Sequence, residues 1–151
     1  MSNEQVERQF EECCRQKSGS YLVCFRDDCP RHAECLRWHV GRYVSAEPMA
    51  RPAVNPRHEG VATDGCPLFR SSRRVVLKRG LTRMYDDMPA RIERAVRRDL
   101  YAAFCRKYYF EMRKGERPIT PAQQQTILDT CRRHGWTGPV VYDAEELGWE
   151  W

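Results

Sequence analysis

The first seventeen residues carry the hydrophobic spacing of an amphipathic helix. Val6, Phe10 and either Cys13 or Cys14 recur at intervals of three or four positions, which places them on one face of a helix over residues 3–17. Acidic residues lie early in this segment and basic residues late, as the helix dipole favours. The apolar stripe predicts that another part of the chain covers this helix.

A second pattern of the same period predicts a long helix from about residue 86 to residue 114. Asp86 and Asp87 offer an acidic N-cap, Pro89 suits the first turn, and Gly115 ends the helix. The apolar side of this helix carries Ile92, Val96, Leu100, Ala103, Phe104 and Tyr108.

The run Thr120-Pro121-Ala122-Gln123 has the form of a capping box with proline at the first helical position. It predicts a third helix, which continues to His134 and ends at Gly135. The apolar face of this helix is formed by Ile127, Leu128 and Cys131.

Short extended segments are predicted at residues 21–25, 73–81 and 140–142, where apolar and β-branched residues cluster between turn residues. After the last of these, Asp143 is expected to cap a single turn through Leu147.

Residues 27–68 contain five prolines, and only residues 33–44 could form a helix of useful length. A loop-rich segment of this length is unusual in a compact domain unless another interaction holds it in place. A bound metal is the simplest such interaction, because metal binding contributes directly to folding.

A length of 151 residues fits one domain, and we predict a single domain over residues 1–151. Its predicted fold is α+β and mainly helical, with short β elements. Residues 18–70 form a loop-rich, cysteine-clamped half that packs against a three-helix core. The helical segment of the domain spans residues 85–151. A small domain buries a modest share of its surface, so a metal clamp would add useful stability.

The start of the chain lacks the basic and apolar run of a secretory signal, and no segment reaches transmembrane length. We therefore expect a cytoplasmic protein with no membrane association. Thiols stay reduced in the cytoplasm, so the eight cysteines are expected to be metal ligands, buried small residues or reactive thiols.

Four cysteines of the first half could meet around one metal. Cys24, Cys29 and Cys35 are separated by four and five residues, and Cys66 follows across the proline-rich loop. Zinc takes four thiolates tetrahedrally, and a four-iron, four-sulfide cluster also takes four cysteines. We predict zinc, with the cluster as the alternative and buried, reduced thiols without metal as a third possibility.

Two features of this region leave the ligand set open. The absence of a Cys-x2-Cys knuckle and the presence of Cys29-Pro30 and Cys66-Pro67 are typical of iron–sulfur ligands rather than zinc ligands. Against that, His32, His39 and His58 lie in the same region, and His32 could replace a cysteine in a mixed zinc site.

The other four cysteines lie on or beside the apolar stripes of the predicted helices and are expected to be core residues: Cys13, Cys14, Cys105 and Cys131.

The formal net charge is +5, and most basic residues are arginine. Arg91, Arg94 and Arg98 fall at helical spacing on the long predicted helix. One interpretation is phosphate contact along nucleic acid, with a steep dependence on salt. The other is a solvated face paired with Glu93 and Asp99.

No phosphate-binding loop, nucleophile elbow or convincing carboxylate pair is present, so the sequence favours a protein that is not an enzyme. We predict a small metal-supported scaffold that acts as a binding module for protein or nucleic acid. An iron–sulfur or thiol redox protein is the alternative from another class.

Several short motifs resemble those of a family of short, uncharacterised bacterial proteins: Cys29-Pro30, Cys35-Leu36-Arg37, Tyr85 to Pro89, Gly115-Glu116-Arg117-Pro118 followed by Thr120-Pro121, and Gly148-Trp149. The resemblance spans most of the chain and implies no particular activity.

Overall fold

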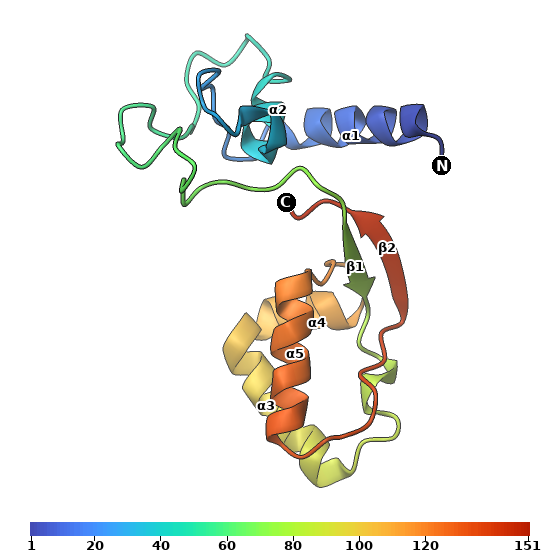
Figure 1. Ribbon diagram of the computed structural model, residues 1–151. Coiled ribbons are helices and arrows are strands. Elements are labelled where there is room, and N and C mark those ends of the chain that lie inside the picture. Colours follow the sequence, from blue (N-terminus) through green and yellow to red (C-terminus); the bar gives the residue numbers. More distant parts are fainter. The chain divides into compact units, whose positions relative to one another are not determined.

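The computed structural model describes residues 1–151, and the chain divides into two compact units. The first contains residues 1–73 together with Trp151, and the second contains residues 74–150. The fold is α+β and mainly helical, as the sequence predicts (Figure 1). Its elements are α1 (Asn3–Lys17), α2 (Leu36–Gly41), β1 (Val75–Arg79), α3 (Ala90–Phe104), α4 (Arg106–Arg113), α5 (Pro121–Arg133) and β2 (Ala144–Gly148). The single-domain organisation stays a prediction.

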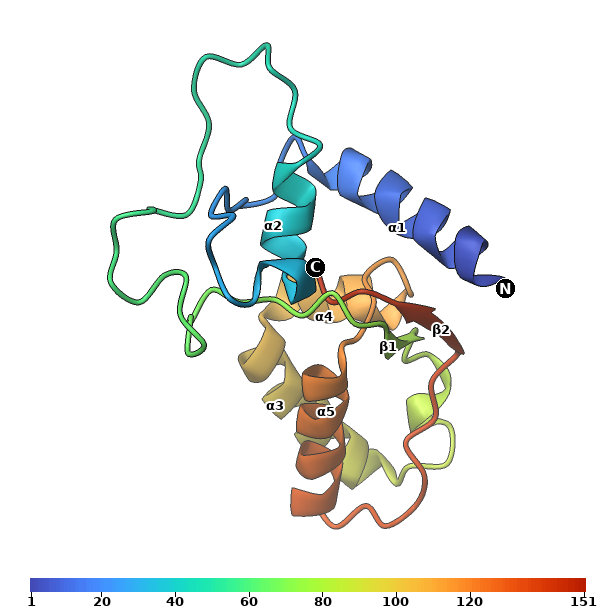
Figure 2. The ribbon, with the colours of Figure 1, turned by 45° about the horizontal axis from the view of Figure 1, so that its top comes forward.

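The first unit contains two helices and a long irregular segment (Figure 2). Helix α1 matches its predicted bounds, and Ser2 and Gln5 form a reciprocal capping box at its start. Its apolar face packs into a small core around Cys14, Val23 and Val40. The helix predicted over residues 33–44 is shorter, with a 3₁₀ turn, His32–Glu34, before α2.

Arginine side chains hold the irregular segment of the first unit together. Arg37 donates hydrogen bonds to the carbonyl oxygens of Leu68 at 2.7 Å and Leu22 at 2.9 Å. Arg51 donates in the same way to Ser18 at 2.8 Å and Tyr21 at 3.1 Å. Each bond joins segments at least fifteen residues apart, so guanidinium groups replace part of the backbone pairing that the prolines prevent.

The second unit packs helices α3, α4 and α5 with the two-stranded antiparallel sheet formed by β1 and β2. The sheet register pairs Val75 with Gly148 and Arg79 with Ala144. The buried core is made by Leu81, Met84, Tyr85, Met88, Val96, Leu100, Tyr109, Met112, Ile119, Ile127 and Cys131. This core is larger than that of the first unit.

The prediction of a single helical turn after Asp143 is wrong, because residues 144–148 form the strand β2. Glu145 pairs with Lys78 and Glu146 with Arg79 across the sheet. These cross-strand ion pairs favour the strand over a local turn.

The Asp143 carboxylate fastens the turn that follows β1. It accepts hydrogen bonds from the Thr82 hydroxyl at 2.8 Å and from the backbone N–H groups of Thr82 and Arg83 at 3.1 and 3.2 Å. Burial alone would raise the pKa of Asp143, but these hydrogen bonds outweigh it and lower the pKa.

Gly80 allows this approach of Asp143, and we expect Gly80→Ala to destabilise the second unit by about 2–3 kcal/mol. Gly80 has a φ of +73°, and a Cβ there would collide with the Asp143 carboxyl group, whose Cγ would lie 2.7 Å away. Urea denaturation measures the loss, with Gly19→Ala as the control because nothing lies within 4 Å of that position. Adding Asp143→Ala to Gly80→Ala should recover part of the lost unfolding free energy. A Gly80→Ala variant as stable as the parent would contradict this account.

The long helix predicted over residues 86–114 is two helices, and its predicted N-cap is wrong, whereas Gly115 follows the end of the second helix as predicted. Helix α3 begins at Ala90 with Pro89 as its N-cap and without a side-chain cap, so Asp86 and Asp87 do not cap it. It ends at Phe104, and α4 begins after Cys105.

Cys105 separates α3 from α4 with a φ of 55° and a ψ of 155°, a conformation that glycine adopts far more readily than cysteine. Its side chain is exposed, so the prediction that Cys105 belongs to the core is wrong.

We expect Cys105→Gly to stabilise the protein by about 0.5–1 kcal/mol, because relief of backbone strain exceeds the added entropy of the unfolded chain. Thermal unfolding of the second unit checks this. Cys105→Ala is the matched control, since it removes the thiol and keeps the strain. Equal melting temperatures for the two variants would show that the strain is not relieved.

None of the helices combines the length and the apolar character needed to cross a bilayer.

Candidate four-cysteine site

The four cysteines predicted to be ligands line one cavity of the first unit: Cys24, Cys29, Cys35 and Cys66. The cavity measures about 20 Å³, which is room for roughly one water-sized sphere. Apart from Thr63, the other side chains that line the cavity are apolar or basic. The structure therefore gathers residues that the sequence spreads over more than forty positions.

Backbone hydrogen bonds fix the path of the chain at three of these cysteines. The N–H group of Cys24 donates to the Arg37 carbonyl oxygen in α2 at 3.0 Å. Cys35, which precedes α2, forms an isolated antiparallel bridge with Ser71. Cys66 lies in a turn in which its N–H group donates to Thr63 and its carbonyl oxygen accepts from Phe69.

The thiols are close enough to affect one another electrostatically. Burial raises the pKa of the Cys24 thiol, a hydrogen bond from the Arg26 backbone opposes that rise, and the thiols of Cys35, Cys29 and Cys66 add to it. A cation among them would remove the repulsion between ionised thiolates.

Three arginines also line the cavity and fasten its walls. Arg31 donates to the Asp64 carbonyl oxygen at 2.9 Å and stacks 3.4 Å over the Phe69 ring. Arg26 forms an ion pair with Asp28 and donates a hydrogen bond to the Pro56 carbonyl oxygen. Arg37 donates to the carbonyl oxygens of Leu22 and Leu68. These roles were not predicted from the sequence, where the available signal is arginine recurring among the cysteines in a segment poor in regular structure.

The histidines of this region are engaged with the backbone. His32 lines the cavity, its Nδ1 lies 2.7 Å from the Cys29 carbonyl oxygen, and its ring packs edge-on against Trp38. The Nε2 of His39 lies 2.7 Å from the Ala33 carbonyl oxygen, and the Nδ1 of His58 accepts from Gly60. Of the three, only His32 lies at the cavity.

No three His, Cys, Asp or Glu side chains stand together in an arrangement that could hold a metal ion as they lie. The four thiols line the cavity wall without forming such a group. The donor set itself suits zinc or an iron–sulfur cluster, because both take four thiolates. Of the remaining cysteines, Cys14 and Cys131 are fully buried, as predicted for core residues.

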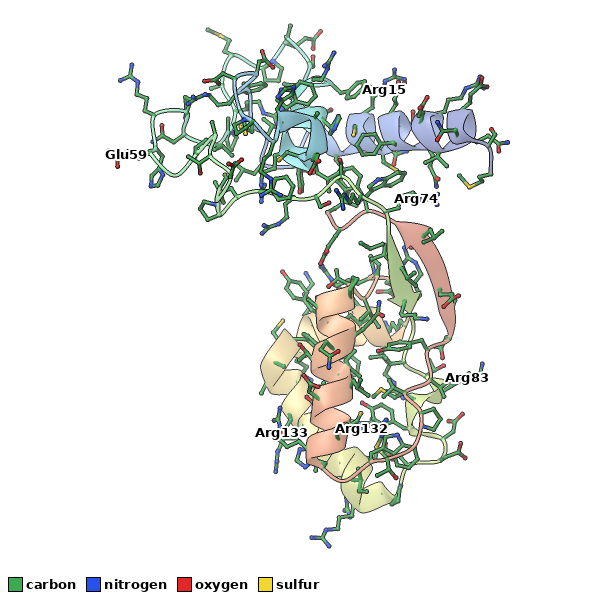
Figure 3. The ribbon with its side chains drawn as sticks, in the orientation of Figure 1. Arg15, Glu59, Arg74, Arg83, Arg132 and Arg133 are labelled. Carbon is green, nitrogen blue, oxygen red and sulfur yellow. The ribbon has the colours of Figure 1, made fainter.

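The arginines predicted to contact nucleic acid lie on α3 of the second unit. Arg91 and Arg98 line a groove together with Arg133 and His134. Arg133 is the last residue of α5 and is labelled in Figure 3. Arg94 lies outside that groove, and its Nε donates to the Ala90 carbonyl oxygen of its own helix. Nucleic-acid binding stays a prediction.

These features define a two-unit α+β protein with a four-cysteine cavity in its first unit and an arginine-lined groove in its second. A protein family described as "Family of unknown function (DUF6078)" matches residues 3–151, and the chain belongs to that family. Comparison with curated proteins and with solved structures found no match.

Proposed function

We propose that the first unit is a zinc-supported binding module in which Cys24, Cys29, Cys35 and Cys66 hold one ion. The observation that carries the proposal is their position around one small cavity. Four protein thiolates close the coordination shell of zinc, so such an ion supports folding and leaves no open position for a substrate.

The bonds across the cavity walls favour a single ion over an iron–sulfur cluster. A four-iron, four-sulfide core contains eight atoms and is far larger than one ion. Insertion of a cluster would require the walls that Arg31 and Arg37 fasten to move apart.

The basic residues around the cavity suit the charge of the proposed centre. A divalent ion with four thiolates carries a net negative charge, and Arg26, Arg31 and Arg37 line the same cavity. Their guanidinium groups are already held by carbonyl oxygens, so they would compensate that charge without reorganisation.

We infer a cytoplasmic location, where thiols remain available to a metal, and a protein or nucleic-acid partner. Support for a binding role comes from Phe25, which follows Cys24 and is 54% exposed. A large apolar side chain displayed beside a rigid centre is the kind of anchor that interfaces use.

Elemental analysis and absorption spectroscopy of the purified full-length chain test the proposal. Protein purified with reductant, without chelator and without a histidine tag should contain zinc in equimolar amount and be colourless. Cobalt in place of zinc should give thiolate-to-cobalt charge-transfer absorption, and Cys29→Ser should lose both signals. Cys131→Ser is the matched control and should keep them.

Bound iron with visible absorbance would establish the iron–sulfur alternative instead. Folded protein that contains no metal and takes up neither zinc nor cobalt under reducing conditions would overturn the proposal.

A further inference from the structure

A second candidate site lies in the other unit, independent of the cysteines. A groove of about 630 Å³ runs between α3 and the end of α5, a volume typical of sites for small molecules. Its apolar lining includes Ile92 and Ala95, and its basic lining is formed by Arg91, Arg98, Arg133 and His134. No carboxylate lines it.

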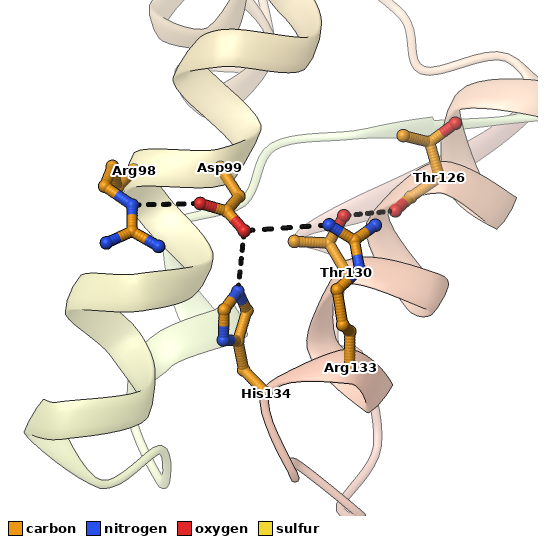
Figure 4. Close-up of polar contacts among 6 residues, drawn as sticks. All are labelled: Arg98, Asp99, Thr126, Thr130, Arg133 and His134. Atoms are coloured by element: carbon orange, nitrogen blue, oxygen red, sulfur yellow. Dashed lines mark hydrogen bonds and ion pairs between the residues drawn. The ribbon is translucent and has the colours of Figure 1, made fainter.

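Three of these basic side chains, those of Arg98, Arg133 and His134, contact one carboxylate beside the groove, that of Asp99 on α3 (Figure 4). Its Oδ2 lies 2.7 Å from His134 Nε2 and 3.6 Å from Arg133 Nη1, and its Oδ1 accepts from Arg98 Nε at 3.0 Å. Two of these groups come from α5 and its C-cap, so Asp99 joins the two sides of the groove.

The arginines keep donors available for a ligand. Arg98 uses only its Nε toward Asp99, which leaves its two terminal nitrogens able to donate, and its side chain is 74% exposed. Arg133 reaches Asp99 through one terminal nitrogen and is 64% exposed. With Arg91, three positive charges face one negative charge, so the site keeps a net charge of about +2 before His134 is counted.

We propose that this groove binds a phosphate group carried by a small organic molecule. A phosphate monoester bears about two negative charges at neutral pH, which matches the surplus of the groove, and arginine forks bind its oxygens in pairs. Ile92 and Ala95 offer apolar contact to the body of such a ligand. The three arginines line one groove and Arg94 lies outside it, which suits one phosphate group better than the repeating charges of a nucleic acid.

Titration of the full-length, isotope-labelled protein with adenosine 5′-monophosphate, followed by amide NMR shifts, tests this proposal. Shifts should concentrate at residues 89–98 and 133–135, and adenosine without phosphate should not reproduce them. Arg98→Gln combined with Arg133→Gln should weaken binding at least about tenfold, as expected for loss of charge-assisted hydrogen bonds. Arg94→Gln, an exposed arginine of the same helix outside the groove, should bind as the parent does.

A single-stranded oligonucleotide titrated in parallel separates the two kinds of phosphate source. Tighter binding of the oligonucleotide, weakened equally by Arg94→Gln, would overturn the proposal and assign the basic residues to a nucleic-acid surface. Absence of shifts at millimolar adenosine 5′-monophosphate in folded protein would also overturn it. Because the site lies in the second unit, neither outcome bears on the zinc proposal.

Discussion

Replacing Cys66 by serine is expected to abolish zinc binding and to unfold most of residues 1–73 while residues 74–150 stay folded. Structural zinc contributes roughly 10–16 kcal/mol to the folding of small zinc-dependent peptides, which exceeds the total stability of many domains. The first unit has a small buried cluster, around Cys14, Val23 and Val40, and a few further buried side chains to oppose that loss. Amide hydrogen exchange measures the two units separately in one experiment.

Cys105→Ser is the matched control for the Cys66 variant. Its side chain is exposed and lies in the second unit, so we expect a change in unfolding free energy of less than about 0.5 kcal/mol and no loss of metal. Protection that persists across residues 1–73 of the Cys66→Ser variant would contradict the prediction. The arginine-to-carbonyl bonds would then suffice to hold the segment.

The parts of the fold that the sequence predicts best are those specified by local interactions. Ser2 with Gln5, and Thr120 with Gln123, form capping boxes that a reader can recognise without knowing the rest of the structure. The helix starts they define follow directly, because the capping groups and the N–H groups they satisfy lie within one turn.

The errors occur where distant residues decide the conformation. Residues 144–148 contain two adjacent glutamates and look like a turn or a short helix when read alone. They form a strand that pairs with β1, in which Lys78 lies opposite Glu145 and Arg79 reaches Glu146 diagonally across the sheet. A cross-strand pairing between positions more than sixty residues apart has no signature in either segment by itself.

The break at Cys105 illustrates a different limit. The apolar spacing of residues 92–108 suits one uninterrupted helix, and cysteine is not a helix-breaking residue. Tertiary packing overrides this preference: Tyr101 of α3 contacts both Tyr109 and Phe110 of α4, an arrangement in which the two helices pack against each other. Such an override cannot be read from spacing alone.

The candidate site was partly accessible from sequence. Cysteine count and spacing, together with the missing regular structure, were enough to choose the four residues that line one cavity. The supporting arginines could not be predicted from the sequence, because an arginine that binds a distant carbonyl oxygen looks the same there as any surface arginine. Their partners are identified only by the folded path of the chain.

Tyr109→Ala is expected to destabilise the second unit by about 3–5 kcal/mol, the usual cost of removing a large buried aromatic ring. Tyr109 is fully buried, packs edge-on against Tyr101 and shares a 2.7 Å hydrogen bond with the hydroxyl of Tyr85. Burial raises the pKa of both tyrosines, so both stay protonated and one hydroxyl must donate to the other.

A double-mutant cycle separates the ring from the hydroxyl pair. Tyr109→Phe keeps the packing but leaves the buried Tyr85 hydroxyl without this partner, at an expected cost of about 1–3 kcal/mol. Combining it with Tyr85→Phe removes both hydroxyls, so the double variant should lose less stability than the two single losses added together. Chemical denaturation followed by circular dichroism gives all four free energies. Strictly additive losses would mean that the two hydroxyls do not depend on each other.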